Sequence, residues 1–267
     1  MPAKKELKAK VCQEIDKGRD EIISIAETIL RNPEPGFKEF KTAKLVSEKM
    51  TGLGIPHQTG IGITGIKGAV NGGSPGPSVC VMGELDSLIV PEHPFADKAT
   101  GAAHVCGHNC QIAMMLGVAA AITRTGILPS LAGRVVFIAV PAEEGIEIEW
   151  RDDMMKQGKL HALGGKVEFI KLGALDDVDM VMMTHTSSEL GDNKLAIGGT
   201  NNGFVAKRVI YTGRSAHAGG APHRGINALN AAMLALNAIH AQRETLQDND
   251  TVRLHYIITK GGDSVNA

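Results

Sequence analysis

The sequence has few aromatic residues, no long apolar run and almost no net charge. Aromatic residues make up 3% of the 267 positions, whereas glycine is plentiful, with 32 residues. This balance suits an α/β fold with many tight turns between strands and helices. No stretch approaches the roughly 20 consecutive apolar residues that span a bilayer. The formal net charge of −1 gives no indication of a nucleic-acid or membrane partner.

Cysteine is also scarce. The four cysteines show none of the spacing of a disulfide framework, so reduced thiols are expected; they are Cys12, Cys80, Cys106 and Cys110. The N-terminal residues are charged and lead into a helical pattern, with no apolar signal segment behind them. We therefore expect a cytoplasmic protein.

Apolar periodicity predicts alternating helices and strands in residues 1–195. Helical spacing occurs at 4–31, 38–51, 108–125, 151–158 and 165–173, and strand-like apolar runs occur at 60–70, 79–85, 134–140 and 178–184. The last three runs are typical of buried strands. The pattern predicts an α/β fold in which helices cover a mostly parallel sheet. Residues 196–267 differ, because a strand (203–213), a helix (223–241) and a strand (251–259) indicate the start of a smaller α+β domain.

Two short motifs carry the ligand chemistry of a metal site. The first is His104-Val-Cys-Gly-His-Asn109, and the second is Pro141-Ala-Glu-Glu-Gly145. Thiolate, imidazole and carboxylate are the groups that hold zinc or a similar divalent ion. The glycine between Cys106 and His108 lets both side chains face one point, and the following helix N-terminus is expected to lower the thiol pKa. Of two adjacent glutamates, one can bind the metal while the other serves as base for a water.

The positions of these residues in the predicted sheet favour a shared site. Asp86, the pair Glu143 and Glu144, and His185 all follow predicted strands, and the carboxyl ends of parallel strands meet at one edge of a sheet. Each residue also has an ordinary structural interpretation. A buried cysteine is often only packed, paired acids are usually solvated, and a histidine such as His185 can be a core residue with one hydrogen bond.

Three further residues have less certain roles. Asp86 could orient a ligating histidine. His104 competes as a ligand with its neighbours, and we interpret it as supporting the site or contacting substrate. His217 lies in a glycine-rich loop before a helix, where a phosphate cradle is conceivable but the glycine spacing fits no phosphate motif well.

The order of the motifs resembles the M20 metallopeptidase and amidohydrolase family. Within it, the chain is most like the aminoacylase-like branch, with aminobenzoyl-glutamate utilization proteins, amino-acid-conjugate hydrolases and a group of dipeptidases. The motifs that carry the resemblance are Glu-Leu-Asp86, His-Val-Cys-Gly-His-Asn109, Pro-Ala-Glu-Glu-Gly145, Met-Met-Thr-His185, Ser-Ala-His-Ala-Gly219 and Gly-Ile-Asn-Ala-Leu229. The match runs from about residue 20 to the last residue.

The resemblance implies a metal-dependent amidohydrolase that cleaves N-acyl amino acids or dipeptides. A catalytic domain (1–195) would carry two divalent ions, with zinc or manganese favoured and cobalt or nickel as alternatives, and a lid domain (196–267) would form a homodimer. Glu143 would be the general base, His217 would stabilise the oxyanion across the dimer, and Asn266 would contact substrate. The implied metal ligands are Cys106, His108, Glu144 and His185.

The chain departs from the family pattern in three places. Asn109 stands where many relatives have aspartate, and residues 87–103 and 146–163 are unusual around the site. The chain also ends at Ala267, inside the expected lid and before the family's last metal-binding histidine. One alternative is therefore a truncated, inactive relative that only binds metal or ligand or dimerises. A second is a one-metal hydrolase or deaminase-like zinc enzyme, whose paired-cysteine signature is absent here.

Overall fold

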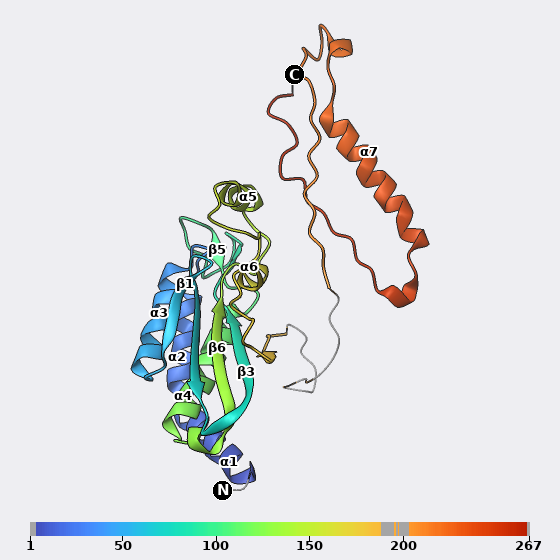
Figure 1. The fold of residues 1–267 in the computed structure, drawn as a ribbon. Helices are drawn as coiled ribbons and strands as arrows, with labels where there is room; N and C mark the ends of the chain where they lie inside the picture. The colour runs from blue at the N-terminus through green and yellow to red at the C-terminus, as the bar shows by residue number, and fades with distance from the viewer. Residues whose placement is uncertain (1–3, 188–194, 196, 198–202, 266–267) are drawn as a thin grey trace. The chain divides into compact units, whose positions relative to one another are not determined.

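The computed structural model describes residues 4–187, 195, 197 and 203–265, which fall into two compact units. The units are Met1–Leu190 and Gly191–Ala267. Figure 1 shows a central sheet with its helices in the first unit and one long helix in the second.

A five-stranded sheet forms the centre of the first unit, in the order β1-β2-β6-β3-β7. Its strands are β1 (His57–Ile61), β2 (Gly65–Asn71), β3 (Ser74–Glu84), β6 (Ala132–Val140) and β7 (Met180–Met183). Strand β3 pairs in parallel with both β6 and β7, whereas β2 is antiparallel to β1 and β6. Every strand except β2 therefore runs in one direction, and the predicted mostly parallel sheet is confirmed. A short ladder joins β4 (Leu88–Ile89) to β5 (Ala102–Ala103).

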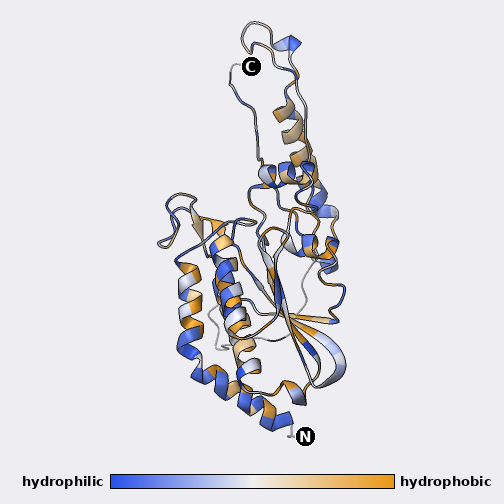
Figure 2. Ribbon diagram, turned by 60° about the vertical axis from the view of Figure 1, so that its left-hand side comes forward, coloured by the Kyte–Doolittle hydropathy of each residue, from blue (hydrophilic) through white to orange (hydrophobic). Residues whose placement is uncertain are grey.

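Helices cover both faces of the sheet, and apolar side chains from several of them are buried there. On one face lie α1 (Lys4–Lys17), α2 (Arg19–Leu30), α3 (Phe40–Gly52) and α4 (His108–Arg124) (Figure 1). Helix α4 is buried along most of its length, whereas α1 has no buried residue and is largely hydrophilic in Figure 2. Phe137 of β6, which is fully buried, packs in the core under these helices. On the other face, Phe169 of α6 (Gly165–Lys171) packs against β3 and β6.

Apart from the long helix of the second unit, the remaining described helices are short. They are α5 (Ile148–Lys156) and the 3-10 helices η1 (Leu128–Ser130), η2 (Pro222–Arg224), η3 (Gln242–Thr245) and η4 (Asp248–Asp250). None of the helices in the described ranges is long and apolar enough to cross a membrane.

Three predictions for the first unit need correction. The single strand expected at 60–70 is instead the antiparallel pair of β1 and β2, with a turn at residues 62–64 between them. The single helix expected at 4–31 is divided at Gly18 into α1 and α2, in keeping with the low helix propensity of glycine. The run 178–184 does form a strand, but not a buried one, because Met182 is 62% exposed and Met183 is 40% exposed. Strand β7 is an edge strand, paired only with β3 within the part of the chain that the structure describes, so its apolar side chains have little to pack against.

The second unit contains one long helix, α7 (Ala228–Ala241). Its first turn is capped by Asn227, whose side chain accepts a hydrogen bond from the Asn230 backbone N–H at 3.0 Å. The strands expected at 203–213 and 251–259 are not formed. The β pairing among the described residues of this unit is limited to an isolated bridge between Arg214 and Ile226. A strand needs a paired neighbour, and the apolar side chains here stay exposed, as Phe204 does at 86%.

Candidate metal centre

The predicted ligands are carried by the ends of three parallel strands and the start of one helix. Asp86 follows β3, the pair Glu143 and Glu144 follows β6, and His185 follows β7. His108 is the first residue of α4. Because β6, β3 and β7 are adjacent and parallel, their carboxyl ends open at the same edge of the sheet.

Cys106, His108 and His185 lie together at this edge. The Cys106 Sγ atom is 3.3 Å from the His185 Nε2 atom, and the ligand atoms of all three residues lie within 4.8 Å of one another. Gly107 makes this possible, because its φ of 92° turns the backbone between the first two ligands. A side chain there would also collide with Thr186, whose Oγ1 lies 2.0 Å from the position of a Cβ atom.

Asp86 fixes the orientation of the His108 ring. The His108 Nδ1 atom lies 2.9 Å from the Asp86 carbonyl oxygen and 3.2 Å from its Oδ1, and both side chains are almost completely buried. On the other side of the ring, the Nε2 atom lies 2.9 Å from Glu84 Oε2 and 3.9 Å from Glu143 Oε2. Burial opposes protonation, but these carboxylates outweigh it and raise the pKa of His108 to about 11. With Nδ1–H bound to Asp86, the Nε2 atom is the one that can bind a metal.

The two glutamates have different surroundings, as expected for adjacent residues. Glu143 is exposed and Glu144 is half-buried. The Glu144 backbone N–H donates to Asp86 Oδ2 at 2.9 Å, which ties the loop after β6 to the loop after β3. Ala142, just before the pair, has a φ of 49°, a left-handed conformation that costs a residue with a side chain about 1–3 kcal/mol.

Burial changes the acidity of the Glu144 carboxyl and the Cys106 thiol. Burial and the Glu143 charge raise the pKa of Glu144. The thiol pKa of Cys106 is raised as well, first by burial, and the Glu144 carboxyl adds to the effect. The expectation of a lowered thiol pKa at the α4 N-terminus is therefore wrong for the metal-free chain, because burial and the nearby carboxylates raise this pKa.

The donor atoms present fit a divalent cation. Sulfur, imidazole nitrogen and carboxylate oxygen are zinc-type ligands. One buried oxygen of the cluster, Glu144 Oε1, has no hydrogen-bond partner within the described residues. Buried carboxylate oxygens without a hydrogen-bond donor are costly unless a cation compensates them.

Sequence reasoning missed Glu84 and Lys166. Glu84 is the last residue of β3 and is 1% exposed, and its carboxylate is paired with the Lys166 ammonium from α6. The same ammonium lies 3.7 Å from Glu143 Oε1, so it links the two carboxylates. The available signal was an acidic residue at the end of an otherwise apolar strand, where a buried charge requires a partner.

His104 is buried, but it does not join the clustered ligand atoms. It is 6% exposed, and neither ring nitrogen has a hydrogen-bond partner within the described residues. Burial, followed by the charge of His108, lowers the pKa of His104 to about 4. Its expected role as a supporting or substrate-contacting residue stays a prediction.

The two remaining predicted site residues belong to the second unit. His217 is exposed, and its Nδ1 atom accepts hydrogen bonds from the backbone N–H groups of Gly219 and Gly220 at 3.2 and 2.9 Å. Two backbone amides of the glycine-rich loop therefore donate hydrogen bonds to the histidine of the same loop. In the neutral ring the proton must then sit on Nε2, which makes that atom a hydrogen-bond donor. Asn266 lies outside the described residues.

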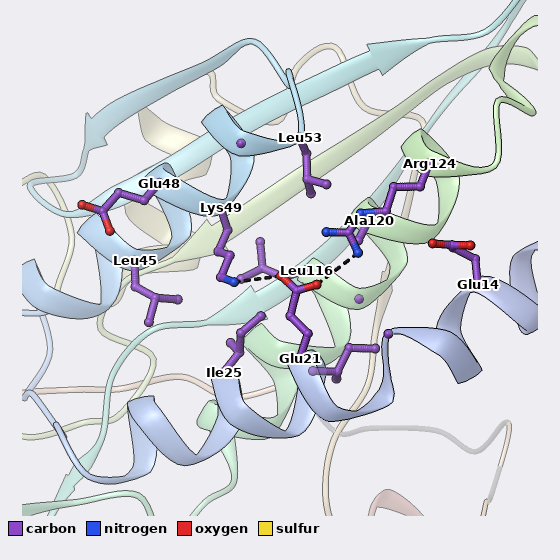
Figure 3. A pocket seen from close by; sticks show the side chains of 14 residues that line it. Glu14, Glu21, Ile25, Leu45, Glu48, Lys49, Leu53, Leu116, Ala120 and Arg124 are labelled. Atoms are coloured by element: carbon purple, nitrogen blue, oxygen red, sulfur yellow. Dashed lines mark hydrogen bonds and ion pairs between the residues drawn. The ribbon is translucent and has the colours of Figure 1, made fainter.

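A cavity of about 480 Å³ lies away from this cluster, between α2, α3 and α4 (Figure 3). At its wall, Glu21 accepts hydrogen bonds from Lys49 at 2.8 Å and Arg124 at 3.0 Å. The ion pairs lower the pKa of Glu21. The cavity is lined by none of the predicted ligands, so we place the chemistry at the sheet edge instead.

Both parts of the chain match models of known protein families. Residues 80–198 match the model of peptidase family M20/M25/M40, and residues 200–267 match the peptidase dimerisation domain. The chain is 31% identical to thermostable carboxypeptidase 2 of Saccharolobus solfataricus, over 88% of this chain and 57% of that protein. It is 28% identical to an N-acyl-L-amino acid amidohydrolase of Geobacillus stearothermophilus, over 80% of this chain and 54% of that protein.

A solved structure extends the likeness to the fold. An aminohydrolase of methicillin-resistant Staphylococcus aureus superposes with a TM-score of 0.62 at 25% identity, covering 90% of this chain and 58% of that one. The chain thus spans little more than half the length of each of these three proteins.

Proposed function

The chain belongs to peptidase family M20, and we propose that it carries the catalytic centre of a metal-dependent amidohydrolase. The bond cleaved would be the amide between an acyl or aminoacyl group and an amino acid, in N-acyl amino acids or dipeptides. One observation carries the proposal: Cys106, His108 and His185 meet beside a glutamate pair at the ends of three adjacent strands. The amidohydrolase and carboxypeptidase relatives support the substrate class.

We propose that this centre holds two divalent ions, zinc or manganese, with Glu144 completing the ligand set of Cys106, His108 and His185. The buried, unpaired Glu144 Oε1 atom supports this assignment. When bound, the ions would acidify a water molecule and polarise the scissile carbonyl group. Asp86 keeps the His108 ring in the tautomer and orientation that ligation needs.

Glu143 is proposed as the general base. Its carboxylate is exposed enough to meet substrate and lies 3.9 Å from the Nε2 atom of the buried ligand His108. It would accept a proton from the attacking water and deliver it to the leaving amine. His217, with its Nε2–H free to donate, would stabilise the developing oxyanion, and Asn266 would contact substrate. The match of residues 200–267 to a dimerisation domain supports a homodimer formed through this unit.

The test compares Glu143→Gln with the unaltered chain after loading with manganese or zinc. Metal content, measured by elemental analysis after dialysis, should stay at about two ions per chain in both proteins, because the variant keeps every proposed ligand. Turnover of N-acetyl amino acids and dipeptides should fall by roughly 10²–10⁴-fold in the variant. Glu149→Gln is the matched control, since this exposed glutamate lies on α5 and outside the cluster.

The outcomes separate the proposal from its alternatives. Full turnover by Glu143→Gln would contradict the assignment of the base. Metal binding by the unaltered chain without any turnover would favour a fragment that only binds metal or ligand or dimerises. A single bound ion with turnover would favour the one-metal hydrolase.

A further inference from the structure

Arg151 is the largest completely buried side chain among the described residues, at 1% exposure. It lies in α5, within the segment 146–163 that separates the glutamate pair from α6. Arginine is rarely buried unless its charge is compensated by a direct partner. A guanidinium in this position therefore needs a structural reason.

The guanidinium donates hydrogen bonds to backbone carbonyl oxygens. Arg151 Nη1 donates to the Glu144 carbonyl oxygen at 2.7 Å and to the Leu163 carbonyl oxygen at 2.9 Å. Its central carbon lies 5.3 Å from the centre of the Phe37 ring. No carboxylate forms an ion pair with it within the described residues, although Asp86 and Glu39 act on it at longer range. Arg151 thus holds the main chain of a proposed metal ligand and the main chain of the segment that follows α5.

The same loop is held from its other side by two buried carboxylates. Glu39 Oε1 accepts the Ala142 N–H at 2.8 Å, and Asp86 Oδ2 accepts the Glu144 N–H at 2.9 Å. Both carboxylate residues are completely buried. The loop also has a left-handed residue at each end, Ala142 with φ 49° and Glu147 with φ 51°. Such a backbone persists only where surrounding contacts determine it.

We propose that Arg151 is a positioning residue of the metal centre. Together with Glu39 and Asp86 it fixes the loop 142–147, and so sets the directions in which the Glu143 and Glu144 carboxyls point. The consequence for metal binding and catalysis rests on the function proposed above, whereas the fixing of the loop does not. Within the described residues Arg151 hydrogen-bonds to none of the proposed ligand side chains and not to the proposed base, so its effect would be transmitted through the main chain of Glu144.

The first test measures amide hydrogen exchange in the metal-free, 267-residue chain. Arg151→Met removes both carbonyl contacts, and the amides of Ala142 and Glu144 should then exchange at least roughly tenfold faster. Arg151→Lys keeps the charge and can reach one carbonyl, so its exchange should be intermediate. Val46→Ala is the control, because Val46 is completely buried on α3 in a core cluster separate from the one that contains Ala142. It lowers global stability and should leave this loop as slow as in the unaltered chain.

The second test uses cobalt as a spectroscopic substitute for the proposed ions. Arg151→Met should weaken cobalt binding by roughly 10–100-fold, the usual effect of removing a residue that orients a ligand. It should also change the visible absorption of the bound cobalt in the direction of the Glu144→Gln spectrum. Arg151→Lys should recover part of both changes, and Val46→Ala should show neither.

The two tests can contradict different parts of the proposal. Unchanged exchange in residues 141–147 of Arg151→Met would overturn the positioning role, whatever the metal does. Faster exchange with cobalt affinity within about twofold of the unaltered chain would overturn the link to the metal centre. If the unaltered chain binds no cobalt, the proposed function fails, and exchange alone decides whether Arg151 fixes the loop.

Discussion

Glu39 should make the first unit less stable as the pH rises from 4 to 8, and Glu39→Gln should remove this dependence. The Glu39 carboxyl is completely buried, and it accepts hydrogen bonds from the Ala142 N–H at 2.8 Å and from the Thr64 hydroxyl at 2.5 Å. Burial, followed by the charge of Asp86, raises its pKa from 4.5 to about 7. Glutamine has the same shape, and its amide can keep both contacts, with its oxygen on Ala142 and its nitrogen on Thr64.

The sign of the effect follows from where the proton is bound. Below about pH 4.5 the carboxyl is protonated in both the folded and the unfolded chain, so it adds no pH dependence. Between pH 4.5 and 7 the unfolded chain releases the proton while the folded chain retains it, and the free energy of unfolding falls. At about 1.4 kcal/mol for each pKa unit, the loss is about 3 kcal/mol when complete above pH 7.

Urea unfolding of the metal-free chain measures this directly. The single tryptophan, Trp150 on α5, reports on the first unit by its fluorescence. The difference in unfolding free energy between the unaltered chain and Glu39→Gln should change by about 3 kcal/mol from pH 4 to 8, since all other titrating groups cancel. Glu48→Gln on α3, where the side chain is 67% exposed, controls for the substitution itself. A difference that stays constant with pH would refute the reasoning.

Three further changes test other contacts of the site. Gly107→Ala would place a Cβ 2.0 Å from Thr186 Oγ1, in a residue whose φ is 92°. The free energy of unfolding in urea should therefore fall by about 2 kcal/mol or more. The thiolate–cobalt absorption band should also be weaker. Lys166→Met leaves the buried Glu84 carboxylate without its ammonium partner; we expect a loss of roughly 1–3 kcal/mol by urea unfolding, which adding Glu84→Gln should largely recover. His185→Gln should lower bound metal from about two ions to about one by elemental analysis.

The central part of the fold follows from local sequence patterns. Residues 79–85 and 134–140 are apolar runs bounded by turn residues, and they became β3 and β6 within a few residues of the predicted ends. The resemblance to the M20 family is confirmed by the matches to both of its domain models. Burial was less predictable, because the exposure of β7 depends on what packs beside it and not on its own composition. For the same reason, apolar segments such as 251–259 did not become strands where no neighbour pairs with them.

The residues of the candidate site likewise differ in how far the sequence could predict them. Cys106, His108 and Glu144 could be singled out because motif spacing and strand ends are properties of the sequence, and parallel topology brings strand ends together. Arg151 could not be found this way, and for Glu84 the strand end indicates a buried acidic residue but not its partner. Glu84 meets a lysine 82 positions away, and Arg151 looks like a surface residue on a charged, nine-residue helix. Their contacts become visible only once α5 and α6 are folded against the strand ends. The proposed ligands are thus encoded in local motifs, whereas Arg151, which holds the loop 142–147, is placed by the packing of the segment 146–163.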